Sequence, residues 1–154
     1  MKLQPLLALG LTLLAASSQA FAGTTLDRIE QKKELVGVLM ESYPPFSFLN
    51  DQNQLDGFDV DVAKAVAQKL GVKLRLETPS WDVIAAGHWS GRYDICICSM
   101  TPSKARAEVF DFPVQYYASP AVIVVNAKDD RIHGAKDLSG KKVGLTSASS
   151  YESY

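Results

Sequence analysis

The chain has 154 residues, of which 47% are hydrophobic and 21% are charged, and its formal net charge is -1. This composition is ordinary for a globular protein and argues against a disordered chain. A nearly neutral chain has no strong field to gather nucleic acid or acidic lipid, so we expect neither as a partner. The length suits a single domain.

The first segment, residues 1–22, predicts a signal peptide. Lys2 supplies a positive start, and the apolar run Leu6–Ala16 that follows is short for a membrane span. Ala20-Phe21-Ala22 has the small-x-small spacing of a cleavage site, so we expect cleavage after Ala22. The mature protein would then work in the periplasm or outside the cell. A retained membrane anchor is the alternative.

The mature chain opens on an alternation of helices and strands. Thr25–Lys33 predicts a short amphipathic helix, and the apolar run Leu35–Met40 predicts a strand that is covered on both faces. A loop over residues 41–57 contains two prolines. Asp59–Leu70 predicts a second helix, because apolar residues recur every four positions, and Gly71 is expected to end it.

The alternation continues toward the end of the chain. Strands separated by helices predict an α/β protein with a mostly parallel sheet and helices on both faces. In such sheets ligands bind beyond the carboxyl ends of the strands, so the loops that follow strands are the candidate site. We expect strands over residues 72–77, 93–100, 121–125 and from 143 to 145, and helices over residues 81–90 and 103–108.

The two cysteines, Cys96 and Cys98, lie two positions apart in a predicted strand, where their side chains share a face. A bridge between them would strain a regular strand, because disulfide geometry is narrow. We therefore expect two packed thiols, with a disulfide as the alternative in an exported chain. The isolated His88 and His133 predict no metal site. No phosphate-cradling glycine loop is present, so no cofactor is expected.

Aromatic side chains follow two of the predicted strands. Prolines at 44 and 45 stiffen the loop that carries Tyr43 and Phe46. We expect Tyr43 to form a pocket wall and Phe46 to pack in the core. Trp81 comes directly after the next strand. It either stacks on a ligand or a cation, or anchors a helix on the core, and both readings stay open.

Hydroxyls and a guanidinium gather after the strand that contains the cysteines. Ser99 and Thr101 follow the end of this strand, where we expect free backbone N–H groups. Arg106, on a short helix, can return its guanidinium to the same place and hold a carboxylate through two parallel hydrogen bonds. Asp59 and Asp61 are predicted to complement a helix N-terminus rather than to form a catalytic pair, so no catalytic residue is assigned.

The chain resembles the family 3 extracellular solute-binding proteins, the polar-amino-acid receptors of ABC importers. The resemblance implies a periplasmic-binding-protein-like (type II) fold, in which two lobes close on a small polar ligand. It also implies a monomer that delivers an amino acid to the membrane subunits of an ABC importer. The motifs that carry it, in the family's order, are Tyr43-Pro44-Pro45-Phe46, Gly57–Ala63, Gly91-Arg92-Tyr93-Asp94, Ser99-Met100-Thr101 through Arg106, and Asp137–Gly144.

The resemblance also implies roles for single residues. By position, Tyr43 and Trp81 would flank the side chain of the ligand. Ser99 and Thr101 would bond its amino end, and Arg106 would pair with its α-carboxylate.

The second lobe contributes to the same implied site. Ser149 and Ser150 would add hydroxyl and backbone N–H bonds to the carboxylate at a helix start. Ala148 stands where the family usually has glycine, so the turn before these serines is expected to be altered.

The resemblance divides the chain into a signal peptide (1–22), an incomplete first lobe (23–120), a hinge strand (121–126) and the start of a truncated second lobe (127–154). The family's acidic partner for the ligand ammonium would lie beyond this stretch. With half of the cleft open to water, the polar contacts should weaken, so we expect weak or no binding by this chain alone.

Two other functions stay open. The first is an exported enzyme on the same scaffold, similar to cyclohexadienyl or arogenate dehydratases, for which Glu41 is the one nearby acid. The second is an inactive, truncated gene product.

Overall fold

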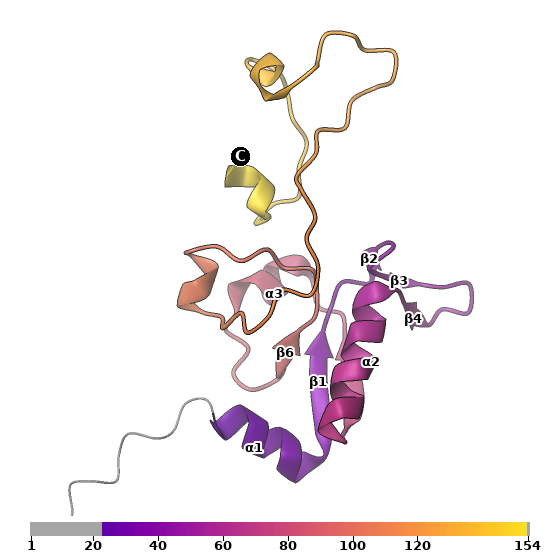
Figure 1. Cartoon of the computed structure of the whole chain (residues 1–154), viewed down its shortest axis with the longest axis vertical. Helices are drawn as coiled ribbons and strands as arrows, with labels where there is room; N and C mark the ends of the chain where they lie inside the picture. Colours follow the sequence, from indigo (N-terminus) through magenta and orange to yellow (C-terminus); the bar gives the residue numbers. More distant parts are fainter. Residues whose placement is uncertain (1–22, 154) are drawn as a thin grey trace, which may run out of the picture.

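The computed structural model describes residues 23–153 (Figure 1). The predicted signal peptide and its cleavage after Ala22 therefore lie outside the described residues. Among the helices of the described part, none has the length and apolarity that crossing a membrane requires.

A three-stranded parallel sheet forms the centre of the fold. After α1 (Gly23–Lys32), β1 (Glu34–Val38) pairs with β5 (Lys73–Glu77) on one side and with β6 (Ile95–Cys96) on the other. Four consecutive residues of β1 are buried, so side chains on both of its faces are covered. This arrangement confirms the predicted α/β class with a parallel sheet.

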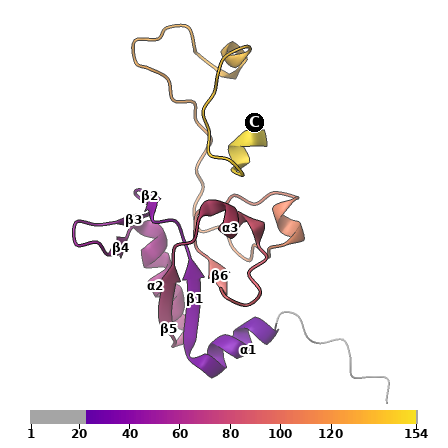
Figure 2. The same cartoon turned by 180° about the vertical axis from the view of Figure 1, so that it is seen from behind.

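Two helices lie on opposite sides of this sheet, α2 (Phe58–Leu70) and α3 (Trp81–Ala86) (Figures 1 and 2). Gly71 ends α2 as predicted, in the left-handed conformation with φ 67°. The core that joins the sheet to these helices contains Val38, Leu39, Val60, Ile84 and Cys98. These contacts bring the starts of both helices to the carboxyl ends of the strands.

The predicted loop over residues 41–57 is wrong, because it folds into a small antiparallel sheet. This sheet contains β2 (Ser42–Tyr43), β3 (Ser47–Leu49) and β4 (Leu55–Asp56), in that order. The strands are two or three residues long, too short for alternating polarity to reveal them.

Gly57 joins this small sheet to α2. Its φ is 119°, and a Cβ at this position would lie 2.5 Å from the carbonyl oxygen of Phe46. The next N–H groups, of Phe58 and Asp59, donate to the carbonyl oxygens of Pro45 (3.2 Å) and Phe46 (2.8 Å). Only glycine fits this approach, which places the first turn of α2 against the loop that carries Tyr43.

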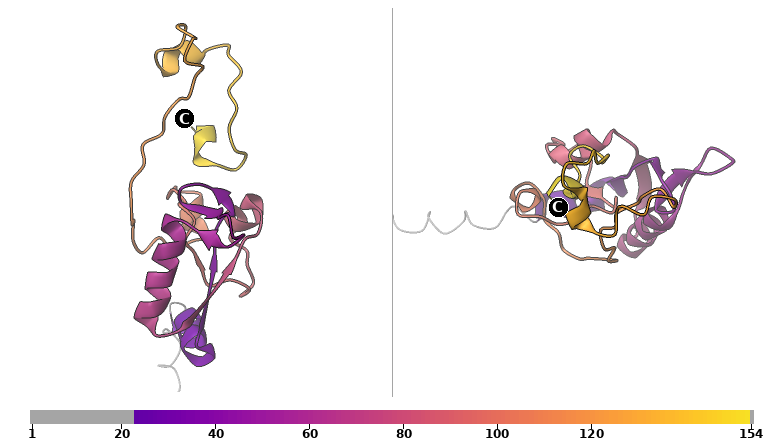
Figure 3. Two further views of the ribbon diagram at one scale, coloured as in Figure 1. Left: turned by 90° about the vertical axis from the view of Figure 1, so that its right-hand side faces the viewer. Right: turned by 90° about the horizontal axis from the view of Figure 1, so that it is seen from above.

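The predicted buried strand over residues 121–125 is also wrong. The segment is extended, but no described strand pairs with it, and Val122 and Val124 are 73% and 89% exposed. An apolar run predicts burial only where another element covers it. Figures 1 and 3 show this segment rising away from the lobe alone. The strand expected at residues 143–145 is likewise absent from the described structure, and Val143 and Leu145 are exposed.

Beyond this segment the chain turns back toward the lobe. The 3-10 helix η2 (Ala135–Leu138) lies at the far end, and η3 (Ser150–Ser153) lies close above the lobe (Figures 1 and 2). The helix predicted over residues 103–108 is shorter in the structure, as the 3-10 helix η1 (Arg106–Glu108). The return of the chain brings the serines near η3 within reach of η1.

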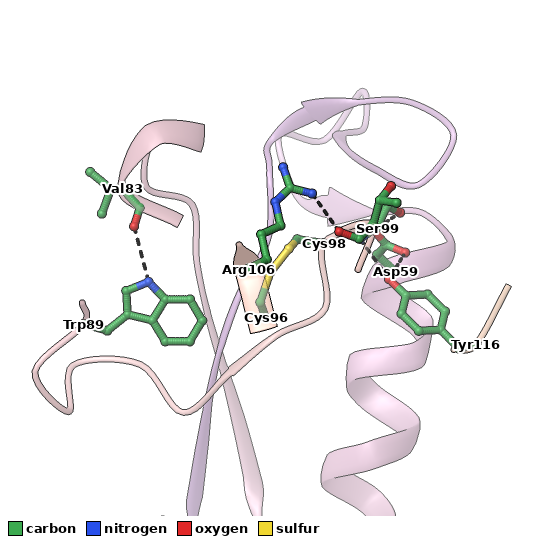
Figure 4. Close-up of a disulfide and its surroundings, with 9 residues drawn as sticks. Asp59, Val83, Trp89, Cys96, Cys98, Ser99, Arg106 and Tyr116 are labelled. Carbon is green, nitrogen blue, oxygen red and sulfur yellow. Dashed lines mark hydrogen bonds between the residues drawn. A yellow bond between two sulfur atoms is a disulfide. The ribbon is translucent and has the colours of Figure 1, made fainter. Parts of the chain in front are cut away.

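A disulfide joins Cys96 and Cys98 (Figure 4), so the expectation of two packed thiols is wrong. Their Cα atoms are 5.4 Å apart, within the ordinary range for a bridge. The prediction assumed a strand that continues through residue 100, but β6 ends at Cys96. The Ile97 N–H still donates to the Val38 carbonyl oxygen at 3.1 Å, but Cys98 lies beyond the end of β6 and outside the regular strand geometry that would oppose the bridge.

The bridge makes a direct prediction about thiol chemistry. The chain has no other cysteine, so we expect no reaction with iodoacetamide in denaturant without a reductant. After reduction, both cysteines should be alkylated, as intact-mass spectrometry would show. Alkylation of both thiols before reduction, in protein purified from an oxidising compartment, would contradict the bridge.

An ion pair with a buried carboxylate ties α1 to the sheet. Arg28 Nη2 lies 2.6 Å from Asp94 Oδ1, while Arg28 Nη1 donates to the Gly91 carbonyl oxygen at 3.0 Å. Asp94 Oδ2 accepts the backbone N–H of Val36 in β1 at 2.8 Å. The Gly91–Asp94 motif is thus a structural clamp between α1, β1 and the turn before β6.

Candidate ligand-binding site

A cavity of about 210 Å³ lies beyond the carboxyl ends of the central strands. In α/β proteins, ligands bind at this edge of the sheet. The cavity is lined by every residue that the sequence assigns to ligand binding: Tyr43, Trp81, Ser99, Thr101, Arg106, Ser149 and Ser150. The structure therefore brings all seven together, from segments more than a hundred residues apart.

Arg106 provides the positive charge of the cavity. Its guanidinium turns back toward the segment that precedes η1, and Nη1 donates to the Thr101 carbonyl oxygen at 2.8 Å (Figure 4). Nη2 donates to the Ala148 carbonyl oxygen at 3.0 Å. Burial lowers the pKa of Arg106 from its ordinary value. Within residues 23–153 no carboxylate forms an ion pair with it, so this partly desolvated cation can take an anionic ligand group.

Trp81 combines the two roles that the sequence leaves open. Its ring packs against the core cluster of the sheet and also lines the cavity. The guanidinium carbon of Arg106 lies 5.4 Å from the ring centroid, so the cation over this face belongs to the protein itself. Trp81 Nε1 donates to the Ala148 carbonyl oxygen at 3.2 Å. The Ala148 carbonyl oxygen thus joins the returning segment to both side chains.

Ala148 adopts the left-handed conformation, with φ 58°. The resemblance implies glycine at this position, and alanine holds the left-handed conformation at a cost because its Cβ disfavours it. Ala148→Gly should therefore stabilise the turn by about 1 kcal/mol through relief of that strain. Chemical denaturation would measure it. The matched change Ala135→Gly, at the start of η2, should be destabilising or neutral, and equal effects at both positions would contradict the explanation.

Tyr43 lies at one end of an aromatic cluster. Its ring stacks on Phe46 with centroids 5.2 Å apart, and Phe46 stacks on Tyr117 at 5.0 Å. Phe58 packs edge-on against both Phe46 and Tyr117. Phe46 is held among other rings but is only partly buried and belongs to neither core cluster, so the prediction of a core residue is wrong. Tyr43 is among the residues that line the cavity.

Ser99 belongs to a closed ring of hydrogen bonds that the sequence does not predict (Figure 4). Its hydroxyl donates to Asp59 Oδ2 at 2.7 Å. The Tyr116 hydroxyl donates to Asp59 Oδ1 at 2.9 Å and accepts the Ser99 backbone N–H at 2.9 Å. That N–H is therefore not free for a ligand, contrary to expectation. The sequence prediction fails because the acceptor, the Tyr116 hydroxyl, lies 17 residues further along the chain.

Burial acts on both acidic groups of this ring. It raises the pKa of the Asp59 carboxyl, while the hydrogen bonds from Ser99 and Tyr116 act in the opposite direction. Burial also raises the pKa of Tyr116 well above its ordinary value. Tyr116 therefore keeps its proton and remains a donor at neutral pH.

The remaining hydroxyls come from both sides of the cavity. Ser150 Oγ lies 3.4 Å from Thr101 Oγ1, which links η3 to the end of the lobe. Ser149 Oγ is buried and has no protein hydrogen-bond partner among the described residues. The expected helix start is wrong in detail, since η3 is a single 3-10 turn and the Ser149 N–H donates to the Thr146 carbonyl oxygen at 3.2 Å.

Several residues in and behind the cavity are not assigned by the sequence. The main one is Asp59, which lies behind Ser99 and does not line the cavity, because a carboxylate in the first turn of a helix also fits simple complementation of the helix dipole. Asp61 behaves in that way: it is exposed and pairs with Lys64 at 3.1 Å. The residues that line the cavity but are not assigned by the sequence are Met40, Ser42, Cys98, Thr146 and Tyr151.

The alternatives of acid–base catalysis and metal binding depend on Glu41 and on clusters of metal-ligating side chains. Glu41 accepts a hydrogen bond from Thr78 Oγ1 at 3.1 Å and is not among the residues that line the cavity. No group of three His, Cys, Asp or Glu side chains within residues 23–153 could hold a metal ion.

Comparison with known proteins agrees with this geometry. The sequence profile of the bacterial extracellular solute-binding proteins, family 3, matches residues 35–148. The chain belongs to this family. A probable amino-acid ABC transporter-binding protein of Haemophilus influenzae is 34% identical over 138 residues, which cover 90% of this chain and 54% of that protein. The L-cystine-binding protein TcyJ of Escherichia coli is 35% identical over 130 residues, covering 84% and 49%. The chain spans about half the length of these relatives.

Solved structures share this fold over part of the chain. An arginine-bound mutant of ArgBP from T. maritima has a TM-score of 0.67 at 32% identity, over 73% of this chain and 54% of that one. The arginine-bound form of domain 1 of that protein has a TM-score of 0.51 at 32% identity, over 53% and 65%. An ancestral cyclohexadienyl dehydratase, AncCDT-3, has a TM-score of 0.51 at 31% identity, over 54% and 34%.

Proposed function

We propose that this chain forms the amino-acid-binding part of an exported solute receptor that supplies an ABC importer. The observation that carries the proposal is the Arg106 guanidinium, which is partly buried in the cavity without a carboxylate partner among the described residues. A partly desolvated cation of this kind favours a carboxylate ligand. The ligand would be a polar L-α-amino acid, held by its carboxylate at Arg106.

The other lining residues are assigned to the rest of this ligand. Tyr43 and Trp81 would flank its side chain, and Ser99 and Thr101 would face its amino end. Ser149 and Ser150 would approach its carboxylate from the returning segment. The cavity of about 210 Å³ has room for a ligand the size of an amino acid.

The expectation of weak binding by this chain needs one adjustment. A solved structure of domain 1 of ArgBP from T. maritima is described as arginine-bound. A first lobe of this fold can therefore hold an amino acid at the concentration used for that structure. We infer that the present chain, which adds the hydroxyls of Ser149 and Ser150 to its first lobe, binds weakly but measurably.

Location and assembly follow from the proposed role. Residues 1–22 would direct export and be removed after Ala22, leaving the mature protein in the periplasm. Residues 121–126 would form the connection between the first lobe (23–120) and the start of the second (127–154). The partners would be the membrane subunits of the importer, and the receptor would be monomeric.

An exported dehydratase is the second candidate, because AncCDT-3 shares the fold. Glu41 lies outside the cavity lining and is engaged by Thr78, so it is not positioned for acid–base chemistry there. Loss of prephenate or arogenate upon incubation with the protein would favour the enzyme.

Isothermal calorimetry with the mature chain tests the proposal. We expect L-arginine, L-cystine or L-histidine to bind, and agmatine, which lacks the α-carboxylate of arginine, not to bind at the same concentration. Binding of agmatine and L-arginine with equal affinity would contradict the proposed carboxylate anchor. Failure of all common L-amino acids to bind would contradict the receptor function of this chain.

A further inference from the structure

The ring formed by Asp59, Ser99 and Tyr116 fixes the direction in which each hydroxyl points. The Tyr116 hydroxyl has one proton and gives it to Asp59 Oδ1, while its oxygen accepts the Ser99 N–H. Ser99 gives its only hydroxyl proton to Asp59 Oδ2 at 2.7 Å. Ser99 Oγ therefore has no proton left to donate, and it can offer the cavity only its lone pairs.

We propose that Asp59 is a positioning residue that holds the Ser99 hydroxyl as a hydrogen-bond acceptor only, so that the cavity selects an ammonium or another N–H donor there. The inference rests on the proposed function, because it explains how that site would recognise the amino end of its ligand. Asp59 itself is 0% exposed and does not line the cavity. It acts through Ser99, which does.

The backbone supports a fixed rather than an adaptable Ser99. Ser99 is not glycine, yet its φ is 56°, in the left-handed region that side chains disfavour. Such a conformation persists only where its surroundings determine it, and these sites gather at ligand-binding positions. Here two hydrogen bonds, one from the Ser99 N–H and one from its hydroxyl, hold the residue from different chain segments.

The charge of Asp59 adds to the effect of its geometry. A hydroxyl that donates to a carboxylate becomes a stronger acceptor, because hydrogen bonds in a chain polarise one another. A cationic ammonium gains from such an oxygen, whereas a second carboxylate would be repelled by it. Arg106, in the same cavity, has the opposite preference. The two residues would thus set the direction in which a zwitterionic ligand lies.

The experiment compares two probes that differ at a single group. L-arginine carries the α-amino group, and 5-guanidinopentanoic acid lacks it but keeps the carboxylate and the guanidinium. With the unaltered chain, we expect L-arginine to bind at least about tenfold more tightly, because a hydrogen bond to a charged group is lost in the analogue. Calorimetry or tryptophan fluorescence would give both dissociation constants.

Asp59→Asn should reverse the direction of the Ser99 hydroxyl. Tyr116 must still donate its proton, so the amide oxygen is expected to face Tyr116 and the amide N–H₂ to face Ser99. Ser99 Oγ then accepts from the amide, and its own proton turns toward the cavity, where it opposes an ammonium. The ratio between the two probes should fall to within about threefold, mainly through weaker L-arginine binding.

Two variants separate this role from a general loosening of the lobe. Asp61→Asn changes an exposed carboxylate in the same helical turn and should leave the ratio unchanged. Tyr116→Phe frees the Ser99 N–H but keeps its hydroxyl on Asp59, so both probes should weaken by a similar factor. If Asp59→Asn does not fold, Ser99→Ala, which removes the acceptor itself, should reduce the ratio to the same extent.

The outcomes distinguish this inference from the proposed function. An unaltered ratio in folded Asp59→Asn, or in Ser99→Ala, would overturn the role of Asp59 while leaving amino-acid binding intact. Equal weakening of both probes by Asp59→Asn would also overturn it, since that result describes a structural residue. If the unaltered chain binds neither probe nor any other amino acid, the proposed function fails and the inference fails with it.

Discussion

Arg106→Ala is expected to weaken amino-acid binding by about 2 kcal/mol, the lower end of the cost of removing one partner from a buried charged pair, because Arg106 is only partly buried. This corresponds to a loss of roughly thirtyfold in affinity. The physical reason is that the ligand carboxylate would enter a partly desolvated cavity with no opposing charge. The measurement is calorimetry with L-arginine, or with the amino acid that binds most tightly to the unaltered chain.

Three further variants make this result specific. Arg106 also packs over the Trp81 ring, so Arg106→Met, which keeps an apolar stem, tests whether lost packing causes the effect. We expect it to bind as weakly as the alanine variant. Arg106→Lys keeps the charge without the planar fork and should be intermediate. Arg92→Ala, at an exposed arginine over the Tyr93 ring and away from the cavity lining, is the matched control and should bind normally. Normal binding by Arg106→Ala would remove the basis of the proposed site.

The central layer of the fold could be predicted from the sequence because its signals are local. The strand at β1 is a run of buried residues, and a four-residue apolar repeat predicts α2 with Gly71 at its end. The repeat does not mark the buried face of α2, which consists of Asp59, Val60, Ala63 and Ala67. The lining residues could be predicted because parallel strands bring their carboxyl ends to one edge. Trp81 begins the helix after β5 and Ser99 follows β6, while Tyr43 lies in the short strand β2 that comes after β1.

The failures involve contacts between distant segments. Residues 121–125 have the composition of a buried strand, but composition does not say which element will cover them. The disulfide depends on where β6 ends, and that is decided by pairing with β1 rather than by the cysteines themselves. Asp59 meets Ser99 and Tyr116 across 40 and 57 positions of sequence. No local sequence pattern predicts contacts over such separations, so the sequence alone presents Asp59 as an ordinary helix-start residue.

Arg28→Ala should destabilise the fold by about 3 kcal/mol, near the lower end of the range for breaking a buried ion pair. The variant strands Asp94, whose side chain is 2% exposed and lies 2.6 Å from the lost guanidinium. Arg28 itself is 27% exposed, and Asp94 keeps the N–H of Val36, so the full cost is not expected. Urea denaturation of the unaltered and variant chains would measure the difference in the free energy of unfolding.

Lys64→Ala provides the matched comparison, because it also removes the cation from a pair that is anchored on a helix. The Asp61–Lys64 pair is 70% and 59% exposed, so its loss should cost less than about 1 kcal/mol. Both variants replace a cation on a helix with alanine. A larger loss in the free energy of unfolding for Arg28→Ala is therefore attributed to the burial of its partner. If Arg28→Ala and Lys64→Ala cost the same, the clamp between α1 and β1 contributes no more than a surface pair. The Gly91–Asp94 motif would then need another explanation than holding the first helix on the sheet.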